Sequence, residues 1–181
     1  SDLVYFPSFK YLQEVLPRFE AVAARNTLVM MQVPRMNERQ KEQFLNVFNV
    51  ANPETVVGFA VMGGIFGEGI DLVGERLVGA IVVGVGLPQI GLERDLIKGY
   101  YDDHENAGFA YAYTYPGMNR VLQAAGRVIR SEVDRGLLLL IDKRFSREDY
   151  VELYLPSWGA PKRTRSLEEI GEAVGVFWGS A

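Results

Sequence analysis

Five short apolar segments are spaced along the chain, and each is nearly continuous rather than alternating with polar residues. They are Leu3–Phe6, Thr27–Met31, Val56–Met62, Gly79–Val85 and Leu137–Ile141. A strand that is apolar on both faces is typical of a parallel sheet covered by helices. The pattern therefore predicts an open, mainly parallel sheet of about five or six strands.

Segments with helical periodicity lie between most of these strands. Ser8 is a predicted N-cap for a helix that continues to about Ala24. Asn37 and Gln40 have the spacing of a capping box that opens a second helix. Another helix is predicted from Met118 to Ile129. The alternation of strands and helices indicates an α/β fold with right-handed crossovers and helices on both faces of the sheet.

Length and composition fit one globular domain. The chain has 181 residues, of which 48% are hydrophobic, and it contains no cysteine. The absence of cysteine excludes disulfides, thiolate metal sites and cysteine catalysis within this chain. No apolar run approaches the ~18 residues of a membrane span, so we expect a cytoplasmic protein. The chain begins almost directly on a strand without an initiator Met, which suggests a piece of a longer protein.

Charge is distributed unevenly. The net charge is −4, but residues 120–147 carry seven Lys or Arg against three Asp or Glu, a local charge of +4 that leaves −8 elsewhere. The basic residues of this island are Arg120, Arg127, Arg130, Arg135, Lys143, Arg144 and Arg147. A basic island on an acidic chain favours a defined anion site over a broad surface that coats nucleic acid.

Two arginines in this island stand three residues apart in an otherwise apolar helix. On a helix, Arg127 and Arg130 would share one face, with Gln123 one turn before Arg127. Two guanidinium groups on one face suit a polyanion such as a triphosphate. The alternative is an exposed pair of charges with no specific ligand.

A glycine-rich, acidic segment follows the third apolar run. It contains Gly63, Gly64, Glu68, Gly69 and Asp71. At the carboxyl end of a parallel strand it lies where open α/β sheets bind ligands, and its glycines allow a close approach. It lacks the Gly-Lys-Ser/Thr of a phosphate-binding loop, so its carboxylates are better suited to ribose hydroxyls, a metal-bound water or the arginines. The alternative is a glycine-rich turn with exposed acids.

Two further features favour structural roles. His104 is the only histidine, and it stands in an acidic stretch without the partners of a metal site or a catalytic triad. The aromatic stretch Phe109–Tyr115 could stack on bases, but packing is the commoner use of aromatic side chains at this density.

Three segments together resemble a known family. Phe6–Phe9, Gly63–Asp71 and Gln123–Ser131 resemble motifs IV, V and VI of superfamily 2 helicases, in the form of the DinG/XPD branch, and occur in the same order and spacing. The resemblance extends from Tyr5 to about Trp158. It implies the second, C-terminal RecA-like motor domain of an ATP-dependent DNA helicase over residues 1–158, with residues 159–181 as a loop and helical extension of it. Two predicted helix starts, at Ser146 and Ser166, flank the loop.

The resemblance also implies which parts are elsewhere. In this family the Walker A lysine and the DEAH-type box that binds Mg²⁺ belong to the first motor domain, so ATP with Mg²⁺ would be held mainly by that domain. Four cysteines that hold an iron–sulfur cluster in many members are absent from this chain; such a cluster would belong to the full-length protein. No metal site is expected in this chain.

By the resemblance, Arg127 and Arg130 would be arginine fingers for the γ-phosphate, and Gln123 would orient the attacking water or link the fingers to the nucleotide. Nucleotide binding would further involve the residues Glu68, Gly69, Asp71 and Gly126. Single-stranded DNA would be contacted by Ser8, Gly63 and Gly64, through its backbone and without reading its sequence. The expected partners are single-stranded DNA and the first RecA-like domain of the same polypeptide, with no membrane.

Two other functions are alternatives to a helicase motor domain. The chain could be a non-catalytic module of helicase-like fold whose basic island recruits a partner or an anion. An independent nucleotide-binding enzyme is disfavoured, because the chain has no phosphate-binding loop and no plausible pair of nucleophile and base. The isolated chain is expected to be inactive.

Overall fold

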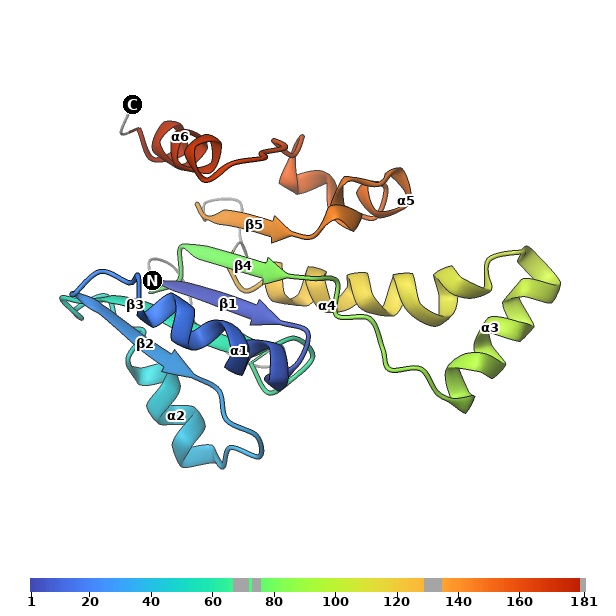
Figure 1. Cartoon of the computed structure of the whole chain (residues 1–181), viewed down its shortest axis with the longest axis horizontal. Coiled ribbons are helices and arrows are strands. Elements are labelled where there is room, and N and C mark those ends of the chain that lie inside the picture. The colour runs from blue at the N-terminus through green and yellow to red at the C-terminus, as the bar shows by residue number, and fades with distance from the viewer. Residues whose placement is uncertain (67–71, 73–75, 129–134, 180–181) are drawn as a thin grey trace.

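A five-stranded parallel sheet forms the centre of the computed structural model, which describes residues 1–66, 72, 76–128 and 135–179. The strands follow the order β2-β3-β1-β4-β5, and all neighbours are parallel (Figure 1). They are β1 Asp2–Phe6, β2 Thr27–Met31, β3 Thr55–Val61, β4 Gly79–Val83 and β5 Leu137–Ile141. The predicted parallel α/β sheet is confirmed, and the predicted bounds of β2 and β5 match those of the structure.

The central strand β1 shows why its sequence has no polar alternation. Leu3 and Tyr5 enter one hydrophobic core, whereas Val4 and Phe6 enter a second core on the opposite face. Successive side chains of a strand point to opposite faces, so a strand covered on both sides must be apolar throughout. The edge strands β2 and β5 are only half-buried over most of their length.

Helices cover both faces, as predicted. Helix α1 (Phe9–Glu20) packs through Leu12 against the core that contains Val4 and Phe6. Helix α2 (Glu38–Asn46) and helix α4 (Tyr115–Ala125) contribute to the core on the other face, which contains Leu3 and Tyr5. The fold is therefore an open α/β sheet between two helical layers, as expected for a RecA-like domain.

The predicted helix starts at Ser8 and Asn37 are confirmed, whereas α1 ends before the predicted Ala24. The Ser8 Oγ atom accepts a hydrogen bond from the Tyr11 backbone N–H at 3.2 Å. Asn37 and Gln40 form a reciprocal capping box with two hydrogen bonds of 2.9 Å. Helix α1 ends at Glu20, because the following residues face solvent; Val22 is 81% exposed. No apolar contact there would offset the entropy of another helical turn.

Helix α3 (Leu92–Glu105) was not among the predicted elements. With the π-helix η2 (Ala110–Thr114) it projects beyond the carboxyl ends of the strands (Figure 1). None of its residues is buried, and its apolar residues Leu92, Leu96 and Tyr100 are exposed. It packs closely on η2 only because Gly108 has no side chain: a Cβ there would collide with the Lys98 carbonyl oxygen.

The aromatic stretch mainly packs against this projection. The Tyr111 ring stacks on Tyr101 with a centroid distance of 3.8 Å, and its hydroxyl donates to Glu105 Oε2 at 3.0 Å. Tyr113 is buried. The predicted packing role is confirmed for these two residues, while Phe109 remains 51% exposed.

The C-terminal part comprises η3 (Lys143–Ser146), α5 (Glu148–Val151), η4 (Pro156–Trp158) and α6 (Leu167–Trp178). Ser166 caps α6 as predicted, accepting from the Glu169 N–H at 3.2 Å. The segment Ser146–Asp149 does contain a helix start, as predicted, but the N-cap of α5 is Arg147 and Ser146 lies within η3. No helix in the described ranges is both long and apolar enough to cross a membrane. The division at residue 158 stays a prediction.

Candidate functional site

The carboxyl ends of three central strands bring the first group of predicted residues together. Pro7 and Ser8 follow β1, the Gly63–Gly64 pair follows β3, and Gly86 lies just after β4. Phe6 is paired with Val61 across the sheet, so the segments after β1 and β3 begin side by side. Ligands of open α/β sheets bind at such an edge.

A buried glutamine holds the loop that follows β3. Gln32 comes directly after β2 and is 4% exposed. Its Oε1 atom accepts the Val61 backbone N–H at 2.8 Å. A Cβ atom on Gly64 would lie 3.0 Å from Gln32 Nε2, so the glycine lets the amide lie directly against the loop backbone.

The loop is anchored again just before its acidic part. Phe66 is fully buried and its ring stacks on Phe44, with centroids 4.2 Å apart. The Tyr5 hydroxyl donates to the Phe66 carbonyl oxygen at 3.2 Å. The chain that leads into the acidic segment is thus fixed from the core. The predicted nucleotide-binding residues of that segment, Glu68, Gly69 and Asp71, lie outside the described residues.

Arg120 of helix α4 spans two of these loops. Its Nη1 atom donates to the Gly86 carbonyl oxygen at 2.9 Å. Its Nε and Cδ atoms would be 3.1 and 3.3 Å from a Cβ atom placed on Gly63, which has a φ of +69°. A glycine is required there both by the left-handed backbone and by the arginine that lies over it.

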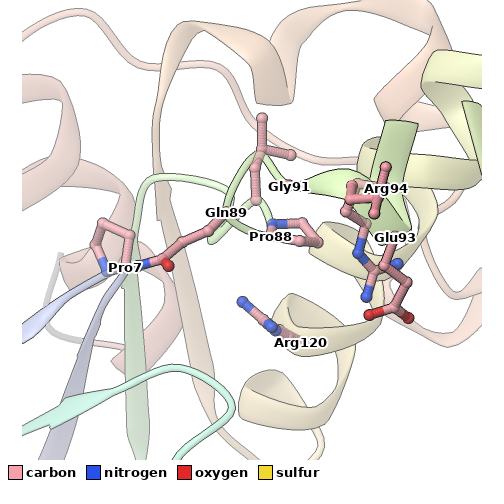
Figure 2. A pocket seen from close by; sticks show the side chains of 9 residues that line it. Pro7, Pro88, Gln89, Gly91, Glu93, Arg94 and Arg120 are labelled. Carbon is pink, nitrogen blue, oxygen red and sulfur yellow. The ribbon is translucent and has the colours of Figure 1, made fainter. Parts of the chain in front are cut away.

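A pocket of about 530 Å³ opens beside Arg120 (Figure 2). Pro7 and the segment after β4 line one side, and the start of α3 lines the other. Arg94 of α3 and Arg120 of α4 line the same pocket from different helices (Figure 2). Through Pro7 the pocket adjoins Ser8. Glu93 lines it as well, so the charged groups of this polar recess are two arginines and one carboxylate, a net charge of +1.

The second group of predicted residues occupies the far end of α4. Gln123 is exposed in the last turn, Gly126 is the C-cap, and Arg127 is half-buried. The prediction that the α-helix continues to Ile129 is wrong: it ends at Ala125, and the Arg127 N–H donates to the Ala124 carbonyl at 3.2 Å in a tighter turn. Because Arg130 lies outside the described residues, a shared helical face for the two arginines stays a prediction.

Helix α4 runs antiparallel to the strands and separates the two groups. Its Arg120 lies at the carboxyl edge beside Gly86, whereas Val128, beyond its end, packs on Gly136 just before β5. From Arg120 to Arg127 the rise along a helix is about 10 Å. The structure thus gathers Ser8, Gly63 and Gly64 at one edge and places Gln123, Gly126 and Arg127 away from it.

The basic island does not form one patch. Arg135 lies over the rings of Phe177 and Trp178, at 4.8 and 5.4 Å from their centroids. Arg147 pairs with Asp149 at 2.8 Å. Several cations of the island therefore have local partners, and the defined anion site expected from the island stays a prediction.

Asp142 follows β5 at the same carboxyl edge and holds another cation of the island. Its Oδ1 accepts from the Arg144 backbone N–H and Nε at 2.8 and 2.9 Å, and its Oδ2 accepts from Arg144 Nη2 at 2.7 Å. These hydrogen bonds hold the pKa of the Asp142 carboxyl below its ordinary value and raise the pKa of the Arg144 guanidinium.

The described part of the chain offers no set of ligands for a metal ion, since no three His, Asp or Glu side chains converge there. His104 is exposed, its Nδ1 atom is 2.6 Å from the Tyr100 carbonyl oxygen, and its ring stacks on Tyr100 at 4.2 Å. These contacts fit the structural role expected for it.

Sequence reasoning missed three residues of this edge. Gln32 carried one signal, a polar residue directly after an apolar run. Arg120 was counted only as a charge of the island, although it stands three residues before Gln123 and hence on the same side of the helix. Arg94 lies on the helix that was not predicted.

Comparison with known proteins gives the family. The family described as "Helicase C-terminal domain" matches residues 2–162. The chain is a helicase C-terminal domain. It is of the DinG/XPD type within superfamily 2, as the three motifs predicted.

Relatives of this helicase C-terminal domain are much longer proteins. It is 26% identical over 166 residues to the XPD helicase subunit of the general transcription and DNA repair factor IIH of Schizosaccharomyces pombe, covering 86% of this chain and 21% of that protein. It is 31% identical over 175 residues to the regulator of telomere elongation helicase 1 of Bos taurus, covering 88% of this chain and 14% of that protein. It is 28% identical to a probable ATP-dependent helicase of Methanocaldococcus jannaschii, covering 81% of this chain and 24% of that protein. The chain thus spans about a fifth of the length of the curated relatives it matches.

Solved structures support the fold of the helicase C-terminal domain. An XPD helicase structure superposes with a TM-score of 0.66 at 20% identity, covering 90% of this chain and 28% of that one. A structure of XPD without ligand gives a TM-score of 0.65, also at 20% identity, covering 84% and 30%. The RecA-like assignment stands on these matches together with the parallel sheet.

Proposed function

We propose that this helicase C-terminal domain is the second motor domain of an ATP-dependent DNA helicase and completes an ATP site held mainly by a first motor domain. The observation that carries the proposal is the arrangement on α4. One short helix joins a positively charged strand edge, suited to a nucleic-acid backbone, to the segment that contains Gln123 and Arg127.

On the nucleotide side, Gln123 is exposed and Arg127, four residues later, is half-buried. An exposed amide with a partly buried guanidinium behind it can be presented to a phosphate on a facing domain. In this role Arg127, with Arg130, stabilises charge that develops on the γ-phosphate, and Gln123 orients the attacking water. Gly126 has no side chain and leaves room for the nucleotide, while Glu68, Gly69 and Asp71 would line the nucleotide from the acidic segment.

In this proposal the phosphate-binding loop and the Mg²⁺ ligands of the ATP site are supplied by residues outside this chain. The sequence has no Gly-Lys-Ser/Thr loop for phosphates, and the described residues offer no cluster of metal ligands. Mg²⁺ and the phosphate loop therefore belong to the first motor domain in our proposal. An iron–sulfur cluster, if the full-length protein has one, must take its ligands from other segments, because this chain contains no cysteine.

On the DNA side, single-stranded DNA would run along the carboxyl edge past Ser8, Gly63 and Gly64. Ser8 caps α1 and leaves its hydroxyl proton to donate to a phosphate, beside backbone N–H groups of the first helical turn. The adjoining pocket with Arg94 adds positive charge. Such contacts hold the backbone without reading bases, as a translocating motor requires.

A non-catalytic binding module is less well supported. The basic island that would recruit its partner is divided among local contacts. In addition, the relative from Methanocaldococcus jannaschii is named a probable ATP-dependent helicase. Both observations favour a motor domain.

The test is the substitution Arg127→Ala in the full-length protein that carries this domain. We expect ATP binding to persist while DNA-stimulated hydrolysis falls by about 10³–10⁵-fold, the range for an arginine finger. Arg147→Ala is the matched control, since this arginine pairs with Asp149 at the surface. It should leave ATP binding and the rate of DNA-stimulated hydrolysis unchanged. Unwinding that persists in the Arg127→Ala variant would reduce Arg127 to a structural charge.

A further inference from the structure

Helix α4 is seated closely on the segment that follows β4. A Cβ atom on Gly117 would lie 2.9 Å from Leu87 Cδ2 and 3.1 Å from the Val85 carbonyl oxygen. One turn further along the helix, Arg120 Nη1 donates to the Gly86 carbonyl oxygen at 2.9 Å. The helix and this segment are thus joined by backbone packing and by a side-chain hydrogen bond, so that they must move together.

The same arginine contacts the loop after β3. Its Nε, Cδ and Cγ atoms lie 3.1, 3.3 and 3.6 Å from the position of a Cβ on Gly63. Gln32 accepts the N–H of Val61 at the end of β3 and lies against Gly64. The start of this loop is therefore contacted from the end of β2 by an amide and from α4 by the Arg120 side chain.

Of the two residues that contact this loop, Gln32 and Arg120, only Arg120 belongs to the helix that carries Gln123. The two residues are three positions apart, so they lie on one side of α4 and about 5 Å apart along its axis. A rigid helix transmits a displacement at its nucleotide end directly to Arg120. A continuous physical path thus runs from Gln123 through Arg120 to the loops after β3 and β4.

We propose that Arg120 is a positioning residue that couples the nucleotide end of α4 to the DNA-facing loops after β3 and β4. This inference rests on the proposed function, because it assumes that those loops face single-stranded DNA. Arg120 acts here through Gly63 and Gly86, and its task is to keep both loops in register with the helix.

Another use of the same side chain is a direct phosphate contact, since Arg120 also lines the pocket. The two roles differ in measurable ways. A phosphate contact contributes to the salt dependence of binding, about 0.7 per contact in the slope of log K against log salt for single strands. Lysine can replace arginine at a phosphate, but it lacks the planar fork that fits against Gly63 while donating to Gly86.

The experiment compares Arg120→Met, Arg120→Lys and Arg94→Gln in the full-length protein with an oligo-dT strand as the DNA. Three quantities are measured: ATP hydrolysis without DNA, its stimulation by DNA, and the salt slope of DNA binding. We expect both Arg120 variants to lose about tenfold in stimulation, within the usual range of coupling between sites, while hydrolysis without DNA and the salt slope stay unchanged. Arg94→Gln should instead lower the salt slope.

Three results would overturn the inference. Wild-type stimulation in Arg120→Met shows that no coupling passes through this residue. A lower salt slope in Arg120→Met that Arg120→Lys restores assigns Arg120 to a phosphate. Equal loss of hydrolysis with and without DNA, accompanied by a lower melting temperature, shows a purely structural role. A wild-type protein that DNA does not stimulate would instead contradict the proposed function itself, and this inference with it.

Discussion

The Arg120 side chain lies across the backbone of Gly63, at a point where the glycine has a φ of +69° and a Cβ atom would come within 3.1 Å of the arginine Nε. The contact joins a helix on one face of the sheet to the turn at the end of its second strand in sheet order. The backbone conformation and the neighbour impose the same requirement, a residue without a side chain.

Gly63→Ala should therefore destabilise the domain. A left-handed backbone costs an alanine about 1–2 kcal/mol, and displacement of Arg120 adds to this cost. Gly99→Ala is the matched control, because Gly99 lies inside α3 with no atom within 4 Å of its Cβ position. That variant should be stabilised by about 0.5–1 kcal/mol, since alanine favours the helix.

Urea unfolding of the purified chain measures the change in the free energy of unfolding for Gly63→Ala and for Gly99→Ala. Opposite signs for the two substitutions would support the close contact at Gly63. Equal effects would show that the free energy of unfolding responds to glycine replacement in general and not to the position of Arg120.

The buried amide of Gln32 makes a second prediction. Gln32→Leu keeps the approximate volume of the side chain but leaves the Val61 N–H without its acceptor at 2.8 Å. An unsatisfied backbone donor of this kind costs about 1–3 kcal/mol. Gln43→Leu on the exposed side of α2 is the control and should change stability by less than about 0.5 kcal/mol. Thermal unfolding that does not distinguish the two variants would contradict the assigned role of Gln32.

The sheet could be predicted because burial on both faces leaves a direct record in the sequence. The central segment Leu3–Phe6 is apolar throughout, and its side chains are buried in the cores on the two faces of the sheet. Helix α3 was not predicted although Leu92, Leu96 and Tyr100 recur at helical spacing in its sequence. In the structure these three side chains are exposed rather than packed on the core, so an apolar pattern does not by itself report contact with the core.

The candidate site was predicted only where a motif carries it. Ser8, Gly63 and Gly64 belong to motifs and do meet at one edge of the sheet. Arg120 and Gln32 act through contacts with residues 34 and 29 positions away, and such distances cannot be inferred from local spacing. The early end of α4 was missed because Gly126, a helix-ending residue type, was interpreted as part of the helical motif.

The isolated chain should hydrolyse ATP at a negligible rate. An arginine finger stabilises charge on a phosphate that other groups hold, and the sequence has no phosphate-binding loop to hold it. Phosphate release with and without Mg²⁺ and single-stranded DNA measures this rate. A robust, Mg²⁺-dependent rate that Arg127→Ala abolishes would show a complete site within these residues and contradict the shared site.

The ion pair between Asp142 and Arg144 should make stability depend on pH in the acid range. Asp142 has a pKa below its ordinary value of 3.8 in the folded protein, so the folded state favours the charged carboxylate. Its stabilisation is fully present above about pH 5 and is lost as the pH falls through 3.8 and below. Asp142→Asn keeps an acceptor for the Arg144 backbone N–H but removes the charge, which should cost about 0.2–1 kcal/mol at pH 7, the range for an ion pair that solvent partly screens.

Urea unfolding at pH 7, 5 and 3 tests this dependence. The difference between wild type and Asp142→Asn should persist from pH 7 to 5 and shrink at pH 3, where the wild-type carboxyl also begins to lose its charge. Asp149→Asn is the control, because its partner Arg147 is exposed and a surface pair contributes little; it should match wild type at all three values. A difference for Asp142→Asn that stays constant down to pH 3 would mean that the carboxylate charge does not stabilise the end of β5, and that the cap alone holds η3 in place.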